Sequence, residues 1–426
     1  MKIFSLIQTA LILFAIVFIS SCSKSGSNPP PKDPGVTFAV TSLSISTGPY
    51  ATSVTITGVG FSATAANNKV SFNGHDAVVD ISSSTKIITS VPLGAGTGNI
   101  SVTVDGKTVS GPVFTYQVAQ VVSPFAGGSK SGAADGNGAS ASFFQPSALA
   151  TDAAGNIYVA DANNSLIRKI TPDGTVTTIA GSSNGYADGK GTAAEFSNPA
   201  GIAVDAAGNI YVSDNTRIRK ITPDGTVSTF AGNNSNQPVD GTGAGASFSH
   251  VIGLVVDGSG NLFVADQGAG HIRKITSVGV VTTIYGGTDI DPYQLVLDKL
   301  GNIYAADLSG NRIDKVTQSG SLTVFAGTGN VIGGEIDGTG SGASFYKPSG
   351  LAIDGNGDFL VIDSGNGLIR QITPAAVVTT FGGRSGSNQY GTITAANFIA
   401  IQGITVDGNG NIYFTVQNEI RKISMQ

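Results

Sequence analysis

The sequence predicts an all-β protein in which a small sandwich domain precedes a larger repeat domain. Two observations predict this fold class: the composition, and a unit of four short β-rich runs that recurs along the chain. The 426 residues include 59 glycines and no tryptophan, and only 12% of them are charged. Short runs of Val, Ile and Thr between glycine-rich turns are typical of strands, and no long interior stretch has the apolar spacing of an amphipathic helix.

The first 35 residues have the pattern of an export signal followed by a tether. Lys2 precedes a mostly apolar run, Ile3 to Ile19, which ends at Ser20-Ser21-Cys22. This ending resembles a lipobox, where signal peptidase cleaves and the new N-terminal cysteine is diacylated. An ordinary signal peptide or a membrane helix is the alternative, although the run is short for a spanning helix. We expect a lipoprotein signal peptide over residues 1–21, then a lipidated Cys22 and a flexible tether over 22–35.

The expected location follows from this segment. A lipid anchor would hold the exported protein on the cell envelope, at the outer membrane, on either its periplasmic or its surface side. Cys22 is the only cysteine, so the chain has no internal disulfide. The formal net charge of −5 is a poor match to a nucleic-acid phosphate backbone, so we expect no nucleic-acid partner.

Residues 36–118 alternate short β-rich runs with turn residues, which predicts an immunoglobulin-like sandwich. Val54-Thr55-Ile56-Thr57 and Lys69-Val70-Ser71-Phe72 are two of the runs. Asn73-Gly74 after the second run is a strong hairpin signal, because both turn positions require a positive φ. Together with Gly111-Pro112-Val113-Phe114, these residues resemble the IPT/TIG family. That resemblance implies a spacer or interaction module without an active site.

Residues 119–426 repeat one unit six times, and such repetition decides the architecture. In the clearest copy, Gly201 to Gly232, four strand-like runs are joined by the turns Asp205-Ala-Ala-Gly-Asn and Pro223-Asp-Gly. The equivalent first aspartates are Asp152, Asp205, Asp257, Asp298, Asp354 and Asp407. Four-stranded units in this number predict a six-bladed β-propeller. The units resemble NHL repeats, with local departures at Asp314 and Val416.

The ends of the repeat region indicate how the ring closes. The last copy stops after its third run, Ile420 to Ile423, whereas Val121 to Gly127 match a fourth run before the first copy begins. We therefore expect the N-terminal segment to complete the last blade and to cover its open edge.

Two recurring charged positions invite a functional interpretation, but a structural one fits better. Asp161, Asp214, Asp266, Asp307 and Asp363 each follow a second run, where a short side chain can cap backbone N–H groups. The pairs Arg168-Lys169, Arg219-Lys220, Arg273-Lys274 and Arg421-Lys422 lie within strands, so their adjacent side chains face opposite ways. Repetition in every blade is what a scaffold requires, whereas an active site is asymmetric.

A longer motif, Asp-Gly-x-Gly-x-x-Ala-x-Phe, lies between the fourth run of one unit and the first of the next. It begins at Asp135, Asp188, Asp240 and Asp337, and a degenerate copy runs from Tyr390 to Phe398. Its Ala and Phe are expected to fix the loop to the scaffold. The residue two positions after each Phe varies: Gln145, Asn198, His250, Lys347 and Ala400. The first four are candidate ligand-binding residues at the channel mouth, and a solvated polar rim is the alternative.

No catalytic set is recognisable. The repeat region has two histidines, His250 and His271, and no nucleophile elbow or phosphate-binding loop. We expect no cofactor, no metal site and a non-enzymatic binding or scaffold protein whose ligand is a protein or a glycan. For a glycan, Tyr186, Tyr346 and Tyr390 are the candidate stacking residues. The alternative, which the resemblance to related propellers implies, is a lyase or hydrolase acting on a polysaccharide or lactone with a divalent cation.

Overall fold

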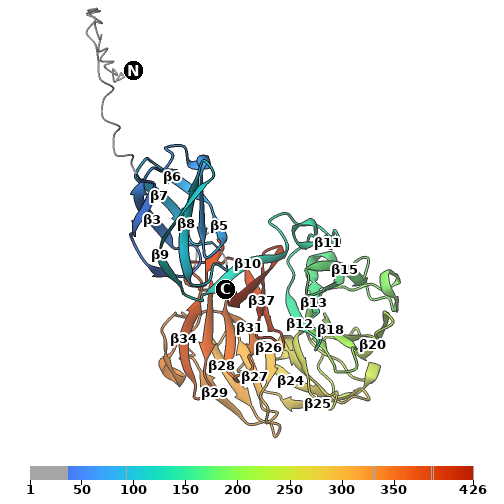
Figure 1. Ribbon diagram of the computed structural model, residues 1–426. Coiled ribbons are helices and arrows are strands. Elements are labelled where there is room, and N and C mark those ends of the chain that lie inside the picture. The colour runs from blue at the N-terminus through green and yellow to red at the C-terminus, as the bar shows by residue number, and fades with distance from the viewer. Residues whose placement is uncertain (1–36, 93, 330–331, 385, 387, 426) are drawn as a thin grey trace, which may run out of the picture.

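The computed structural model describes residues 37–92, 94–329, 332–384, 386 and 388–425 (Figure 1). Within these residues the chain consists of β-strands and short 3₁₀ turns, without an α-helix, so the predicted all-β class is confirmed. No helix in this part of the chain is long and apolar enough to cross a bilayer. The signal peptide, Cys22 and the tether lie outside the described residues, and their assignment stays a prediction.

The N-terminal domain is a sandwich of two sheets that enclose one apolar core. The first sheet has the order β1 (Ala39–Leu43), β3 (Ser53–Val59), β7 (Lys86–Ser90) and β6 (Val79–Ser82). The second has the order β2 (Thr47–Gly48), β9 (Lys107–Tyr116), β8 (Gly98–Val104), β4 (Asn68–Phe72) and β5 (His75–Ala77). Alternate residues face inward, as in Val54 and Ile56 of β3, which are fully buried against Phe72 and Phe114.

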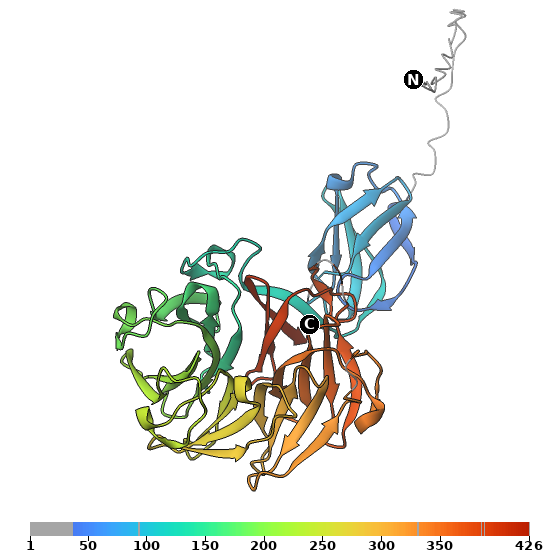
Figure 2. The same ribbon diagram turned by 180° about the vertical axis from the view of Figure 1, so that it is seen from behind.

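The remaining strands form six antiparallel sheets arranged as propeller blades (Figures 1 and 2). Blades 1 to 3 contain β12 (Ala148–Thr151), β13 (Ile157–Asp161), β14 (Leu166–Ile170), β15 (Thr175–Ala180); β17 (Pro199–Val204), β18 (Ile210–Asp214), β19 (Arg217–Ile221), β20 (Thr226–Gly232); and β22 (Val251–Val256), β23 (Leu262–Asp266), β24 (His271–Ile275), β25 (Val280–Tyr285).

Blades 4 to 6 follow the same order from the inner to the outer strand. They contain β26 (Pro292–Leu297), β27 (Ile303–Asp307), β28 (Arg312–Val316), β29 (Leu322–Ala326); β31 (Pro348–Ile353), β32 (Phe359–Asp363), β33 (Leu368–Ile372), β34 (Val377–Gly382); and β36 (Ile401–Val406), β37 (Ile412–Val416), β38 (Glu419–Met425), β10 (Gln120–Gly127). Apolar clusters lie between neighbouring blades, as where Ala160 and Ile167 of blade 1 pack with Ile202 and Val212 of blade 2.

Each blade except blade 4 carries a short fifth strand on its outer edge. These strands are β11 (Gly136–Asn137), β16 (Gly189–Lys190), β21 (Gly241–Thr242), β30 (Gly338–Thr339) and β35 (Gly391–Thr392). They are formed by the Asp-Gly-x-Gly loops and by the degenerate copy in blade 6. The 3₁₀ turns η2 (Gly138–Ser140), η4 (Gly191–Ala193), η5 (Gly243–Gly245) and η7 (Gly340–Gly342) directly follow four of them.

The closure predicted from the sequence is confirmed. β10 pairs antiparallel with β38 from Gln120 opposite Met425 to Gly127 opposite Glu419, with one irregularity near Pro124. Figure 1 shows β10 running from the sandwich domain into the red strands of the last blade. Val121, Val122 and Ala126 are buried there, so the first strand of the propeller region completes the last blade.

The repeated turn on one side of the propeller explains the recurrence of its residues. Oδ1 of Asp205 accepts hydrogen bonds from the backbone N–H groups of Ala207 and Asn209, at 3.0 and 2.8 Å. Gly208 completes the turn at φ +80°, a conformation that suits glycine. The other copies close in the same way, so this face presents nearly identical short turns.

Candidate binding face of the propeller

Two kinds of connection meet on one face, called here the loop face. One kind is the loop that enters each blade and the other joins its second and third strands. In blade 1, Oδ1 of Asp161 at the end of β13 accepts a hydrogen bond of 2.8 Å from the backbone N–H of Phe144 in the entering loop. The predicted placement of both connections on the same side is therefore confirmed.

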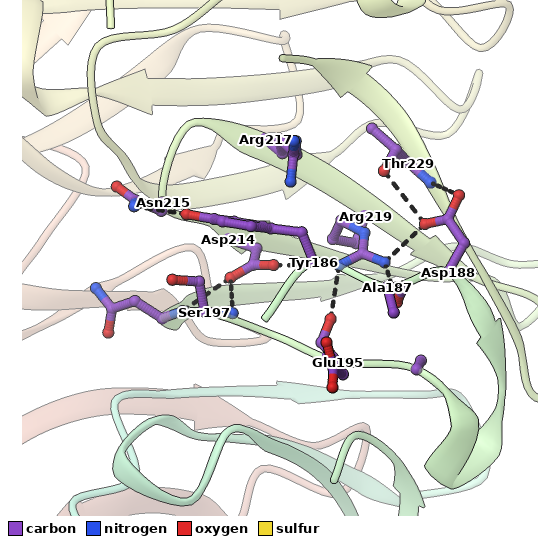
Figure 3. Close-up of polar contacts among 12 residues, drawn as sticks. Tyr186, Ala187, Asp188, Glu195, Ser197, Asp214, Asn215, Arg217, Arg219 and Thr229 are labelled. Atoms are coloured by element: carbon purple, nitrogen blue, oxygen red, sulfur yellow. Dashed lines mark hydrogen bonds and ion pairs between the residues drawn. The ribbon is translucent and has the colours of Figure 1, made fainter. Parts of the chain in front are cut away.

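A buried arginine organises the loop face of blade 2 (Figure 3). Arg219 on β19 is fully buried, and its Nη1 donates to Asp214 at 3.2 Å and to the carbonyl oxygen of Glu195 at 2.8 Å. Its Nη2 donates to Asp188 at 2.7 Å and to the carbonyl oxygen of Ala187 at 2.9 Å. The guanidinium thus joins the second strand to both ends of the entering loop.

The two carboxylates extend this bridge to the backbone. Oδ1 of Asp214 accepts the N–H groups of Ser197 and Asn198, at 2.7 and 2.8 Å. Asp188 accepts the backbone N–H and the hydroxyl of Thr229 on β20, both at 3.2 Å (Figure 3). The loop is therefore held at its start, at its end and against the outer strand. Because a bidentate guanidinium is rigid and always charged, this geometry requires arginine.

The same bridge recurs in blades 1, 2, 3 and 5. Its members are Asp135, Asp161 and Arg168; Asp188, Asp214 and Arg219; Asp240, Asp266 and Arg273; and Asp337, Asp363 and Arg370. In each blade the arginine and the strand aspartate are fully buried, whereas the motif aspartate is about half exposed. Each arginine also lies 5.1 to 5.2 Å from the ring centre of the motif phenylalanine.

These contacts confirm the structural interpretation of the repeated charges. Burial raises the pKa of Asp161 and Asp214, and it raises that of Asp363 to about 6, although the arginine and the hydrogen bonds oppose the effect. In blades 1, 2 and 3 the arginine is followed by a lysine that points to the opposite side, over an aromatic ring; Lys220 lies 5.5 Å from the ring centre of Tyr211. The motif alanines and phenylalanines are buried, as predicted.

The four candidate rim residues lie on this fixed frame. Gln145, Asn198 and Lys347 are exposed and His250 is half-buried. Asn198, His250 and Lys347 directly precede the inner strands of blades 2, 3 and 5, and Gln145 lies three residues before that of blade 1. Gln145 lines a cavity of about 310 Å³ between blades 6 and 1. Their role in binding stays a prediction.

The hydrogen-bond partner of the rim residue's backbone N–H in blades 2 and 3 differs from that in blades 1 and 5. In blades 2 and 3 its N–H, in Asn198 and His250, binds the aspartate of the same blade. In blade 1 the N–H of Gln145 instead donates to Asn418 of blade 6 at 3.1 Å. In blade 5 the N–H of Lys347 donates to Asn311 of blade 4 at 2.7 Å. Both of these rim residues adopt a left-handed conformation, with φ of 50° and 53°.

The three candidate tyrosines are engaged with their own blades to different degrees. The guanidinium of Arg217 lies 4.1 Å from the ring centre of Tyr186, whose hydroxyl accepts a hydrogen bond from Asn215 (Figure 3). Tyr346 is half-buried, with the ammonium of Lys347 5.6 Å from its ring centre. Tyr390 is 48% exposed, and so offers the most accessible ring of the three.

Blade 6 replaces the repeated bridge by a different one. Val416 stands where other blades have the strand aspartate, and Tyr390 stands where they have the motif aspartate. The buried Arg421 pairs instead with Glu419 at the start of β38. The hydroxyl of Tyr390 donates to Glu419 at 2.8 Å, and Arg421 lies 4.4 Å from the ring centre of Tyr390. A single carboxylate from another position therefore neutralises the arginine of blade 6.

Next to this altered bridge lies a polar cleft, called here the seam cleft. It consists of two cavities, of about 310 and 330 Å³, that share Ser129, Gln417 and Asn418 in their walls. The sequence named two residues of these walls, Gln145 and Tyr390, as candidate binding residues, but not the other polar residues. The departure of Val416 from the repeat was the available signal, since Gln417 and Asn418 follow it directly.

Blade 4 departs in a third way. Asp314 occupies the position of the buried arginine, and Arg312, two residues earlier, donates through Nε to Asp314 at 3.0 Å and contacts Asp307 at 3.2 Å. Both carboxylates are buried. Burial, together with the charge of Asp307, raises the pKa of Asp314 to about 7. This is also the blade without a fifth strand.

The residues that line the described part of the central channel carry no formal charge. Each blade contributes one of the following residues, in or directly before its inner strand, to the lining of a small cavity in the channel: Ser147, Ala200, Ile252, Tyr293, Ser349 and Gln402. This set contains no carboxylate and no imidazole, which are the usual protein ligands of divalent cations. Within the described part of the chain, no three His, Cys, Asp or Glu side chains are grouped as a metal site would require.

Comparison with known families agrees with the two domains described above. An IPT/TIG domain model matches residues 39–116, a teneurin NHL domain model matches 180–246 and an NHL repeat model matches 345–372. The chain carries an IPT/TIG domain followed by an NHL-repeat propeller. A curated relative, Protein SUPPRESSOR OF QUENCHING 1, chloroplastic, of Arabidopsis thaliana, is 38% identical over 96 residues. That match spans 22% of this chain and 9% of the relative.

Solved structures are similar to this fold over almost their whole length. An auxiliary nutrient binding protein from Bacteroides thetaiotaomicron has a TM-score of 0.71 at 18% identity, covering 92% of this chain and 99% of that chain. One from Bacteroides ovatus has a TM-score of 0.62 at 18% identity, covering 93% and 100%. A putative phosphatase from Bacteroides thetaiotaomicron has a TM-score of 0.63 at 18% identity, covering 92% and 98%. At this identity the similarity shows a shared fold.

Proposed function

We propose that this chain is a cell-envelope lipoprotein that binds a protein or glycan ligand on the loop face of its NHL propeller, without transforming it. The observation that carries the proposal is the contrast on that face. The same buried bridge fixes the loop in four blades, whereas the rim position that it supports holds Gln145, Asn198, His250 or Lys347. Rigid support of variable exposed residues is how loop-based recognition surfaces are built.

The comparisons support a binding role at the level of architecture. Two of the proteins with a similar fold are named auxiliary nutrient binding proteins, and each is covered almost completely by this chain. In this proposal the IPT/TIG domain is a spacer that holds the propeller away from the membrane, and the lipid on Cys22 is the anchor.

The loop-face assignment is tested by replacing Gln145, Asn198, His250 and Lys347 together with alanine. We expect binding of the ligand identified in a glycan and protein screen to fall at least about tenfold, or roughly 1.4 kcal/mol. The melting temperature should change little, because rim residues are not core. Val278→Ala with Lys299→Ala, both exposed in turns of the opposite face, is the matched control. Loss of binding in the control, with full binding in the rim variant, would contradict the assignment.

The anchor is tested separately by Cys22→Ser. Without the thiol no acyl chain can be attached, so we expect the variant to leave the membrane fraction. A variant that fractionates with membranes as fully as the wild type would show that Cys22 is not the anchor. Metal analysis of the purified protein addresses the enzymatic alternative, which a tightly bound stoichiometric divalent cation would favour.

A further inference from the structure

We propose that the seam cleft is the binding site and that it recognises a neutral oligosaccharide. The inference rests on the proposed function and names both the ligand class and the place on the loop face. It depends on three observations: the position of the cleft, the state of its amide side chains, and its aromatic ends.

The cleft crosses the face of blade 6 where the propeller closes. Its inner cavity is lined by Gln402, which also lines the small cavity in the channel, and by Gln145 at the entrance of blade 1. Its outer cavity is lined by Tyr390 and by Gly128, at the start of the segment that leaves β10. The shared wall of Ser129, Gln417 and Asn418 makes the two cavities one elongated site. An elongated site open to solvent suits a chain of several sugar units.

The cleft lies beside a short connection in blade 6. Gln417 and Asn418 alone connect β37 to β38, and Asn215 and Thr216 alone connect β18 to β19 in blade 2. Four residues, 162–165, connect β13 to β14 in blade 1. Gln417 turns the chain in a left-handed conformation, at φ 53°. The polar residues Gln417 and Asn418 of this connection line both cavities of the cleft.

The amide groups in the cleft are held by one end. Asn163 donates to Oε1 of Gln145 at 2.7 Å, and Asn388 donates to Oε1 of Gln417 at 2.8 Å. The amide nitrogens of Gln145 and Gln417, and both polar side-chain atoms of Gln402, make no hydrogen bond with other described residues. The amide nitrogens of Gln145 and Gln417 can donate, and the amide of Gln402 can both donate and accept. These groups are suited to hydroxyl groups, which also both donate and accept.

An accessible aromatic ring lies in each cavity. Phe144, in the inner cavity, is 38% exposed, and Tyr390, in the outer cavity, is 48% exposed. Aromatic faces supply large apolar contact area to the C–H surface of a sugar ring. Glu419 and Arg421 are the charged side chains that line the cleft, and they neutralise each other. A neutral ligand therefore fits better than an anionic one.

The experiment measures binding of the full chain to maltohexaose, xylohexaose and mannohexaose by isothermal titration calorimetry, with hexagalacturonate as the anionic comparison. We expect at least one neutral hexasaccharide to bind. Gln145→Ala with Gln417→Ala should weaken that binding at least tenfold, and so should Phe144→Ser. The matched controls, Val278→Ala with Lys299→Ala and Leu300→Ser in exposed turns of the opposite face, should change it less than twofold. Asn198→Ala with Lys347→Ala tests the rest of the rim.

The outcomes separate this inference from the proposed function. Absence of binding to all three neutral hexasaccharides, or tighter binding of hexagalacturonate, overturns the ligand class. Binding that is lost in the Asn198 and Lys347 variant but kept in the Gln145 and Gln417 variant overturns the seam cleft and leaves the loop face in place. Binding unchanged in every variant overturns both. Circular dichroism melting of each variant shows that a loss of binding is not a loss of folding.

Discussion

Blades 2 and 6 hold a buried arginine at the same position of the third strand, yet the groups that neutralise it come from different places. In blade 2 the carboxylates of Asp214 and Asp188 flank Arg219. In blade 6 a single carboxylate, Glu419, pairs with Arg421, and the Tyr390 ring takes the place of the second. The difference shows which part of the repeat is constrained. The buried arginine must be neutralised, but the carboxylate that neutralises it can come from another position in the blade.

This freedom has a consequence for the surface. The strand aspartate of blade 2 also holds the N–H groups of Ser197 and Asn198, so replacing it changes the loop above it. In blade 6 Val416 offers no such acceptor, and the seam cleft lies beside it. The difference between the two blades is open to experiment.

The largest effect is expected from removing the strand that closes blade 6. Deleting residues 119–127 exposes the edge of β38 and removes three buried side chains, Val121, Val122 and Ala126. At roughly 1.5–3 kcal/mol for each buried valine and less for the alanine, we expect a loss of about 5 kcal/mol or more. Urea unfolding measures it, and deletion of residues 36–118 is the control, since it removes a separate module. Equal losses would contradict the closure.

The next effect compares the two bridges directly. Arg219→Ala leaves Asp214 buried without its cation, which costs about 3–5 kcal/mol in the free energy of unfolding. Arg421→Ala leaves one carboxylate, Glu419, which keeps the hydroxyl of Tyr390, so we expect a loss of only about 2 kcal/mol. Arg217→Ala, which removes a half-buried cation stacked on Tyr186, should cost about 1 kcal/mol or less. Equal losses for Arg219 and Arg421 would show that the second carboxylate contributes nothing.

Sequence reasoning predicted the parts of this fold that repetition reveals. The six-fold recurrence predicted the propeller, and the incomplete last copy predicted the pairing of β10 with β38. The recurring Asp161 and Arg168 positions were each assigned to the scaffold, but their mutual ion pair was not foreseen, because 7 residues of sequence separate groups that only a strand pair brings together. The seam cleft was missed for the opposite reason. It joins residues near 129 to residues near 417, and it lies where the repeat fails.

Blade 4 sharpens the comparison through its pH dependence. The folded-state pKa of Asp314, about 7, lies above the ordinary value of 3.8, so the folded protein holds a proton that the unfolded chain releases between these values. This contribution to stability is present at low pH and is lost as the pH rises towards 7. Asp314→Asn mimics the protonated form and should escape the loss. We expect the stability of the variant relative to wild type to be higher at pH 8 than at pH 5 by roughly 1–3 kcal/mol, given about 1.4 kcal/mol for each pKa unit.

Urea unfolding at the two pH values checks this difference, and Asp224→Asn is the control. Asp224 is exposed in a turn, where hydrogen bonds from Thr222, Thr226 and Lys190 lower its pKa, so its replacement should not produce a gain at pH 8. A parallel shift of both variants would show that the effect does not come from the buried pair in blade 4.

The smallest effect concerns the conformation of the rim. Lys347 is held at φ 53° because its N–H donates to Asn311 of the neighbouring blade, whereas Asn198 has its N–H on Asp214 of its own blade and no positive φ. Glycine has no Cβ to strain a left-handed backbone, so Lys347→Gly should preserve or raise the free energy of unfolding by up to about 1 kcal/mol. Asn198→Gly gains no such relief and loses chain entropy, so it should cost about 0.5–1 kcal/mol. A higher melting temperature for Lys347→Gly together with a lower one for Asn198→Gly would show that the neighbouring blade fixes the backbone of Lys347. A lower melting temperature for both variants would mean that the left-handed conformation of Lys347 stores no strain.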